Sequence, residues 1–145
     1  MDILFNDIIN KYGVSEKEVD LLNPLILAYI GDAVYEVYVR TYLIGTMKVT
    51  VHKLHTSSIK FVKAKAQSDI IHYLDDKLTD EEKDIVRRGR NAKSGTIPKN
   101  ADVTEYKYAT GFEALMGYLY LKGRHERLEE IFKLCIMKVL DSNQL

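Results

Sequence analysis

The apolar positions of this chain repeat with the period of a helix. Over long stretches they return every three or four residues, and only Pro24 and Pro98 interrupt the chain. The β-branched run Met47–Val51 is short and has no partner strand joined to it by a turn. We therefore predict an all-α fold with helices packed around one core. The predicted helices are Leu25–Leu43, Val51–Leu74, Thr79–Arg90, Thr104–Lys122 and Arg124–Leu140, with a loop at Asn91–Val103.

Three local patterns mark where helices begin. Ser15 and Thr79 are each followed, three residues later, by a glutamate, as in a capping box. Asn23 precedes Pro24, which places a capping side chain directly before a proline at the first helical position. These patterns predict helix starts near residues 16, 24 and 80.

Length and composition narrow the class of protein. A chain of 145 residues fits one domain, and we predict that residues 1–145 form a single unit. The lone cysteine, Cys135, excludes an internal disulfide and a cysteine-rich zinc site. No apolar run is long enough to span a membrane, and the first residues lack the basic start of a secretory signal. We expect a cytoplasmic protein with no membrane partner.

Charge is balanced overall but unevenly distributed. The 21 basic residues equal the 21 acidic ones in number. However, 37–68 holds six basic residues and no acidic one, and 83–100 holds six basic residues and one acidic one. The second stretch runs from a helix end into a polar loop, where Arg and Lys side chains can reach phosphates. Solvated helix faces and interaction with the helix dipole explain part of the same pattern.

Two acidic residues lie within otherwise apolar helices. The helical neighbours of Asp32 and Glu113 are mostly apolar or small, and a buried carboxylate is costly unless it is paired, hydrogen-bonded or metal-bound. Small residues beside them, including Gly31 and Gly117, would allow the two helices to cross closely. The carboxylates would then converge and could bind Mg²⁺, which prefers oxygen ligands. Purely structural roles, with the Asp bonded to a Tyr and the Glu paired with a base, remain open.

Three motifs in this order resemble a known family. The segment Tyr29–Val34 resembles the signature helix of the ribonuclease III catalytic domain, and Phe112–Leu121 resembles its second acidic helix. The intervening Arg88–Gly95 and Pro98–Asn100 are similar to the Mini-III group of that family. The resemblance extends from about Leu21 to Leu140.

The resemblance implies a fold, an activity and an assembly. It implies a ribonuclease III-type helical endonuclease domain that is a homodimer, with each subunit cutting one strand of double-stranded RNA. Asp32 and Glu113 would be the catalytic and metal-binding residues, with Mg²⁺ as the only small cofactor. A separate double-stranded-RNA-binding domain would be absent, as in the Mini-III group. The implied role is maturation of the large-subunit (23S) ribosomal RNA precursor.

The resemblance also suggests which residues contact RNA and which surface is shared in the dimer. Double-stranded RNA is recognised mainly through its backbone and 2′-hydroxyl groups. We expect such contacts from Arg88, Arg90, Asn91, Lys93, Lys65 and Gln67. The side chains of Tyr35, Tyr38, Val39 and Tyr42 line either the core or the dimer interface.

The chain departs from ribonuclease III proper at two positions. Ala28 and Thr110 stand where that enzyme has two further acidic residues, a substitution that the Mini-III group shares. Fewer direct metal ligands are therefore expected. The same departure leaves two other hypotheses open: a non-catalytic RNA-binding or ribosome-associated domain on this fold, and a helical interaction protein with purely structural acids.

Overall fold

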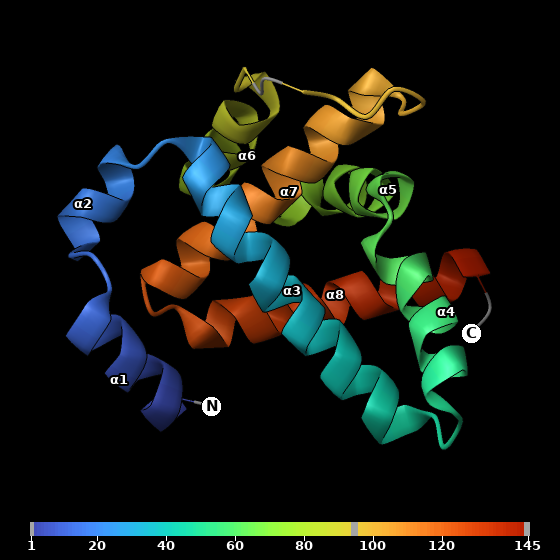
Figure 1. The fold of residues 1–145 in the computed structure, drawn as a ribbon. Helices are drawn as coiled ribbons and strands as arrows, with labels where there is room; N and C mark the ends of the chain where they lie inside the picture. Colours follow the sequence, from blue (N-terminus) through green and yellow to red (C-terminus); the bar gives the residue numbers. More distant parts are fainter. Residues whose placement is uncertain (1, 94–95, 144–145) are drawn as a thin grey trace.

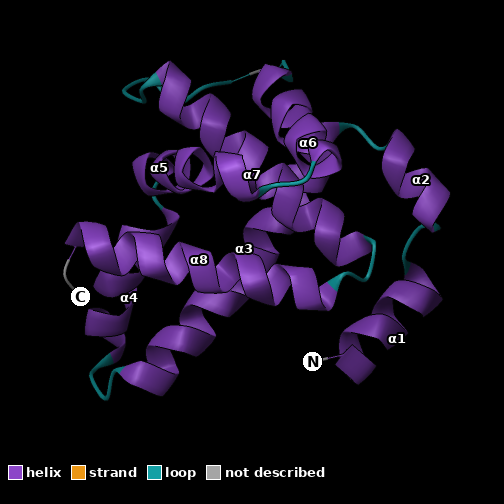
Figure 2. Ribbon diagram, turned by 180° about the vertical axis from the view of Figure 1, so that it is seen from behind, coloured by secondary structure: helices purple, strands orange, loops and turns teal. Residues whose placement is uncertain are grey.

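The structure is a computed structural model that describes residues 2–93 and 96–143. Within these ranges every regular element is a helix, as predicted (Figure 1, Figure 2). None of the described helices is both long and apolar enough to cross a membrane. The helices are α1 (Asp2–Tyr12), α2 (Glu16–Leu21), α3 (Pro24–Thr46), α4 (Val51–Val62), α5 (Ala64–Leu74), the 3₁₀ turn η1 (Asp75–Lys77), α6 (Asp80–Asn91), α7 (Val103–Leu121) and α8 (His125–Asn143).

Helix α7 lies at the centre of the fold. Nine of its ten residues from Gly111 to Tyr120 are buried, which explains why its sequence is apolar on all sides. Helices α3, α5 and α6 pack against it, and Figure 1 shows it behind α3 and between α5 and α6. Buried apolar side chains from these helices and from α8 form one cluster, in agreement with the predicted single core.

Two of the three predicted helix starts have the expected caps. Thr79 and Glu82 form a complete capping box, and the Asn23 side chain accepts a hydrogen bond from the backbone N–H of Leu25. At Ser15 the box is incomplete. The Ser15 hydroxyl accepts from the Glu18 backbone N–H and donates to the Glu18 carboxylate, so the carboxylate does not reach back to the backbone.

The helix predicted over 51–74 is two helices, so that prediction was wrong. The chain becomes extended at Lys63, with ψ 151°, and α5 leaves α4 at an angle. Two buried side chains compensate carbonyls that the break leaves free: the Tyr35 hydroxyl donates to the Phe61 carbonyl and the Gln67 amide to the Val62 carbonyl, each at 3.0 Å. Because the break is supported by these tertiary contacts, no proline or glycine marks it in the sequence.

Two glycines let α3 and α7 touch along their backbones. A Cβ atom at Gly31 would lie 1.7 Å from the carbonyl oxygen of Glu113, and one at Gly117 would lie 1.9 Å from that of Leu27. No larger residue fits at either position. The close crossing predicted from the small residues is confirmed.

Three of the four tyrosines of α3 face the core. Tyr35 and Val39 are buried, while Tyr38 and Tyr42 pack against Phe132 with ring centroids 5.1 and 6.3 Å apart. These residues are therefore core residues. The opposite side of α3 exposes a different apolar row, formed by Ile26, Tyr29, Val37 and Ile44.

Candidate active site

The crossing of α3 and α7 brings the two predicted acids together. Asp32 follows Gly31 on α3, Glu113 lies on α7, and their carboxyl groups are within hydrogen-bonding reach of each other. No Lys, Arg or His of the described chain forms an ion pair with either of them, so the structural pairing of Glu113 with a base is not what the structure contains. Asp32 itself is exposed, and only Glu113 is half-buried, so the expectation that both acids are shielded was wrong for Asp32.

The environment of Glu113 favours its protonated form. Burial raises the pKa of the Glu113 carboxyl, the neighbouring Asp32 raises it further by hydrogen bonding and charge, and together they bring the pKa to about 8. The nearby Gln67 side chain opposes this rise in the pKa. Two carboxylates that share a site without a cation are destabilised by their mutual repulsion. Binding of a cation between them would relieve that repulsion.

The donor set suits Mg²⁺. Asp32 and Glu113 supply carboxylate oxygens, which are hard ligands, and Mg²⁺ is commonly held by one or two carboxylates together with water and substrate phosphate. No cluster of three or more His, Cys, Asp or Glu residues suited to a metal occurs in the described residues. An ion bound by the two acids would therefore keep several coordination positions open to water and phosphate.

Positions 28 and 110 give no further carboxylate, and the structure shows how each side chain is used. Ala28 is buried in the core, and the Thr110 hydroxyl donates to the Tyr106 carbonyl of its own helix at 3.0 Å. Both side chains therefore have structural roles within their own helices.

A third acid, Glu36, was not singled out from the sequence. It lies one helical turn after Asp32, its charge raises the pKa of Glu113, and its carboxylate accepts from Arg40 Nε at 3.0 Å. The spacing of four residues from Asp32 was the signal that could have found it.

A groove lined by part of the predicted basic loop lies one helical turn from Glu113 along α7. Arg90, Asn91 and Lys93 at the end of α6 form one side of it, and Thr110 and Leu25 form the other. Thr110 is one turn before Glu113, and Leu25 is two turns before Asp32. Three of the predicted RNA-binding residues thus share a groove with Thr110, one turn before Glu113. Ser94 and Gly95 of the same motif lie outside the described residues.

Arg90 is held in place, and Arg88 is used elsewhere. The Arg90 guanidinium lies 5.4 Å from the centre of the Tyr108 ring and donates to the Tyr108 hydroxyl at 3.3 Å. Arg88 is half-buried and donates to the Leu22 carbonyl before α3 at 3.3 Å, outside the groove lining. A cation fixed by an aromatic ring is well placed to meet a phosphate.

The two remaining predicted RNA contacts differ sharply in exposure. Lys65 is exposed on α5 and forms an ion pair with Asp69 at 3.1 Å. Gln67 is only 3% exposed and faces Glu113. A side chain buried to this extent does not fit the predicted contact with an RNA backbone on the surface. Its place is beside the acids.

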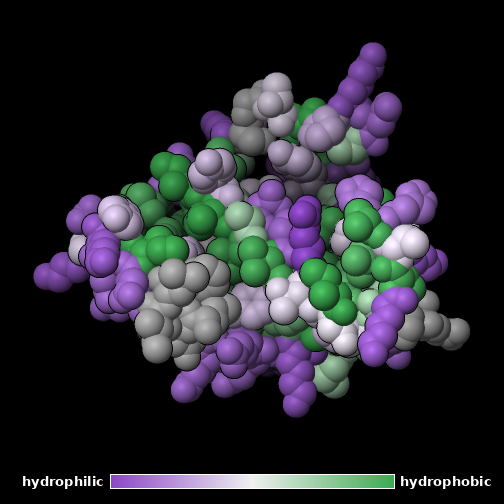
Figure 3. All heavy atoms as spheres, turned by 60° about the horizontal axis from the view of Figure 1, so that its bottom comes forward, coloured by the Kyte–Doolittle hydropathy of each residue, from purple (hydrophilic) through white to green (hydrophobic). Residues whose placement is uncertain are grey.

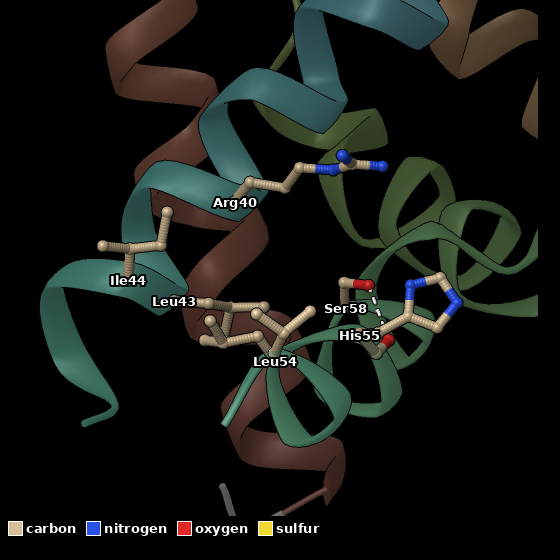
Figure 4. Close-up of a pocket in the computed structure, with 7 residues that line it drawn as sticks. Arg40, Leu43, Ile44, Leu54, His55 and Ser58 are labelled. Atoms are coloured by element: carbon tan, nitrogen blue, oxygen red, sulfur yellow. Dashed lines mark hydrogen bonds between the residues drawn. The ribbon is translucent and has the colours of Figure 1, made fainter. Parts of the chain in front are cut away.

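A second hollow lies between the end of α3 and α4 and contains no carboxylate. Its lining, drawn in Figure 4, includes Arg40, Leu43 and Ile44 of α3 and Leu54, His55 and Ser58 of α4. The Ser58 hydroxyl donates to the His55 carbonyl at 2.7 Å and so serves its own helix. This apolar hollow is not a candidate for the chemistry.

Known proteins are similar to this chain over most of its length. The family model of the ribonuclease III domain matches residues 25–124. A Mini-ribonuclease 3 of Thermoanaerobacter is 53% identical over 118 residues, which cover 81% of this chain and 83% of the relative. A Mini-ribonuclease 3 of Clostridium tetani is 51% identical over 131 residues, covering 90% and 87%. A crystal structure of a protein from Fusobacterium nucleatum superposes with a TM-score of 0.72 at 34% identity, covering 79% of this chain and 92% of that one. With this fold, this acid pair and these relatives, the chain belongs to the ribonuclease III family and to its Mini-ribonuclease 3 group.

Proposed function

We propose that this chain is an endoribonuclease that cleaves double-stranded RNA, with Mg²⁺ held by Asp32 and Glu113. The observation that carries the proposal is the meeting of these two carboxylates at the α3–α7 crossing with no basic residue to neutralise them. Family membership supports the reaction class, and the groove lined by basic residues supports a phosphate-bearing substrate.

Each part of the site has a separate task in the proposed reaction. Mg²⁺, when bound, supplies charge stabilisation at the phosphodiester and activates water for attack. Asp32 and Glu113 hold that ion at the point where the helices cross. Arg90 and Lys93 bind phosphates along the groove, and Asn91 adds hydrogen bonds, so the scissile bond lies over the acids.

We further propose that two copies of the chain pair through the exposed side of α3. Tyr29 is 82% and Ile44 66% exposed, and with Ile26 and Val37 they form an apolar row on one side of the helix. Such a row on a monomer is typical of an interaction surface. The apolar hollow of Figure 4 continues it at Ile44, and Figure 3 shows apolar patches open on the side of the molecule that it brings forward. A two-fold dimer would carry two sites, one for each RNA strand.

The biological setting that we propose is maturation of large-subunit (23S) ribosomal RNA precursor in the cytoplasm. The chain would act there as a single catalytic domain, residues 1–145, without a separate double-stranded-RNA-binding domain. The shared core of α3, α5, α6, α7 and α8 supports one unit, and the names of the relatives support the Mini-III type.

Incubation with duplex ribosomal-precursor RNA tests the function. We expect Mg²⁺-dependent cuts in both strands, and none with EDTA. A duplex that stays intact after long incubation with Mg²⁺, yet is bound, would instead support the non-catalytic RNA-binding alternative that Ala28 and Thr110 leave open.

Sedimentation at micromolar concentration tests the dimer. We expect a dimer for the unmodified chain and a shift to monomer for Tyr29→Ser. Tyr12→Ser is the matched control, because Tyr12 is equally exposed but lies on α1, away from the row. A monomeric unmodified chain, or equal effects of the two variants, contradicts the proposed interface.

A further inference from the structure

The interior beside the acid pair contains a polar side chain that the reaction described above does not use. Gln67 on α5 is 3% exposed, and its Nε2 donates to the Val62 carbonyl at 3.0 Å. Its Oε1 is buried and has no hydrogen-bond partner among the residues that the structure describes. An unpaired buried amide oxygen costs free energy, so an apolar residue would serve the packing of this position better.

The other contact of the amide explains why a polar residue is here. Helix α5 packs against α7, and the Gln67 side chain lies close enough to the Glu113 carboxyl to lower its pKa. One amide N–H is held by Val62 at the α4–α5 break, so the orientation of the group toward Glu113 is set by the backbone of that junction.

We propose that Gln67 is a positioning residue for Glu113, resting on the function proposed above. Its amide, fixed by the Val62 carbonyl, holds the Glu113 carboxylate in one orientation, so that the two acids can bind a divalent ion together. Groups that hydrogen-bond to metal ligands commonly change metal affinity or activity by about 10- to 100-fold when removed.

A purely structural role for Gln67, closing the end of α4, makes a different prediction. The chain offers a matched control for it, because the Tyr35 hydroxyl donates to the adjacent Phe61 carbonyl at the same 3.0 Å. Tyr35→Phe weakens the same junction while leaving the amide beside Glu113 in place. Gln67→Met keeps the approximate size of the side chain and removes the amide.

Three measurements on the unmodified chain, Gln67→Met, Tyr35→Phe and Asp32→Asn decide between these roles. They are the Mg²⁺ dissociation constant of the RNA-free protein by calorimetry, the thermal midpoint, and kcat with KM on duplex RNA. We expect Gln67→Met to weaken Mg²⁺ binding and lower kcat, each by about 10-fold or more, with KM unchanged. Tyr35→Phe should lower the thermal midpoint. It should leave the Mg²⁺ dissociation constant and kcat within about two-fold of the values of the unmodified chain.

The outcomes separate this proposal from the proposed function. Unchanged Mg²⁺ affinity and kcat in Gln67→Met overturn the positioning role, as do losses no larger than those of Tyr35→Phe. A rise in KM alone would assign Gln67 to RNA binding and also overturn it. Failure of the proposed function itself would be seen in Asp32→Asn, which would then cleave like the unmodified chain.

Discussion

Two shielded glutamates of this protein have opposite surroundings. Glu82 on α6 is 2% exposed, yet its carboxylate accepts from Arg127 at 2.8 and 2.9 Å and from the Thr79 backbone N–H at 2.9 Å. Glu113 on α7 has another carboxylate beside it and no base. Burial alone would raise the pKa of Glu82, but Arg127 and Thr79 outweigh burial and hold it below its ordinary value, whereas that of Glu113 is raised.

This difference distinguishes a structural acid from a functional one. The negative charge of Glu82 is fully compensated, and its loss would leave Arg127 without its main partner. Among the described residues no base lies beside Glu113, so without a cation its carboxyl takes up a proton more readily than an ordinary glutamate. In the proposed function, a divalent cation with its phosphate ligand would favour the ionised carboxylate instead.

The largest expected effect is on catalysis at Glu113. Glu113→Gln removes one of the two proposed metal ligands, which should cost several kcal/mol of transition-state stabilisation. Cleavage should therefore be roughly 1,000-fold slower. Single-turnover cleavage of duplex RNA measures it, with circular dichroism as a check on folding. Cleavage within a few-fold of the unmodified rate would remove Glu113 from the site.

The next effect is on stability at Glu82. Glu82→Gln leaves Arg127 partly uncompensated, and we expect a loss of about 2 to 4 kcal/mol, a fall of roughly 10 °C in the thermal midpoint. Glu81→Gln is the control, because its ion pair with Arg124 is far more exposed and should contribute less than about 1 kcal/mol. Equal losses of stability in the two variants would show that the buried ion pair stabilises the fold no more than the exposed one.

A smaller effect is the pH dependence of stability without metal. The pKa of Glu113 is about 8 in the folded protein and near 4.5 when unfolded, so the folded state binds more protons between these values. The free energy of unfolding should therefore decrease as pH rises from about 5 to 8. Glu113→Gln should remove this decrease and raise the thermal midpoint at pH 9 by a few degrees.

Thermal unfolding in EDTA tests this prediction. At each pH, the thermal midpoint of Glu113→Gln is compared with that of the unmodified chain. Added Mg²⁺ should reduce the difference, because it binds the ionised carboxylates. A difference that does not change between pH 5 and 9 would mean that Glu113 titrates normally.

The smallest effect is expected in the groove. Lys93→Ala should weaken RNA binding about five-fold, lower the slope of log affinity against log salt by about 1, and leave kcat unchanged. Lys11→Ala, on α1 and outside the groove lining, is a control for loss of one positive charge. Equal salt slopes for the two variants would place the RNA elsewhere.

The crossing of α3 and α7 could be predicted because its cause is local. Gly31 and Gly117 are visible in the sequence beside the two acids, and the helical spacing places small residues on one face. The same local reasoning was correct for Thr79 with Glu82 and for Asn23 with Pro24, since a cap needs only residues within one turn.

The surroundings of the acids could not be predicted from local spacing. The break at Lys63 is supported by Tyr35, which is 26 residues from the carbonyl that it binds, and the orientation of Gln67 depends on that break. A continuous helix over 51–74 would direct the side chains of α5 differently, so the burial of Gln67 beside Glu113 could not be found from helical spacing. The exposure of Asp32 likewise depends on how far α7 covers α3, which the sequence of α3 does not contain.

Single-turnover cleavage of duplex RNA by Asp32→Asn, compared with the unmodified chain over a Mg²⁺ titration, tests the central claim most directly. Asparagine keeps the size of the side chain and removes its charge, so folding and RNA binding should persist. We expect Mg²⁺-dependent cleavage by the unmodified chain and a rate roughly 1,000-fold lower, or undetectable, for Asp32→Asn at every Mg²⁺ concentration. Cleavage by Asp32→Asn at the unmodified rate and with the same Mg²⁺ dependence would contradict the assignment of the acid pair as the metal-binding centre.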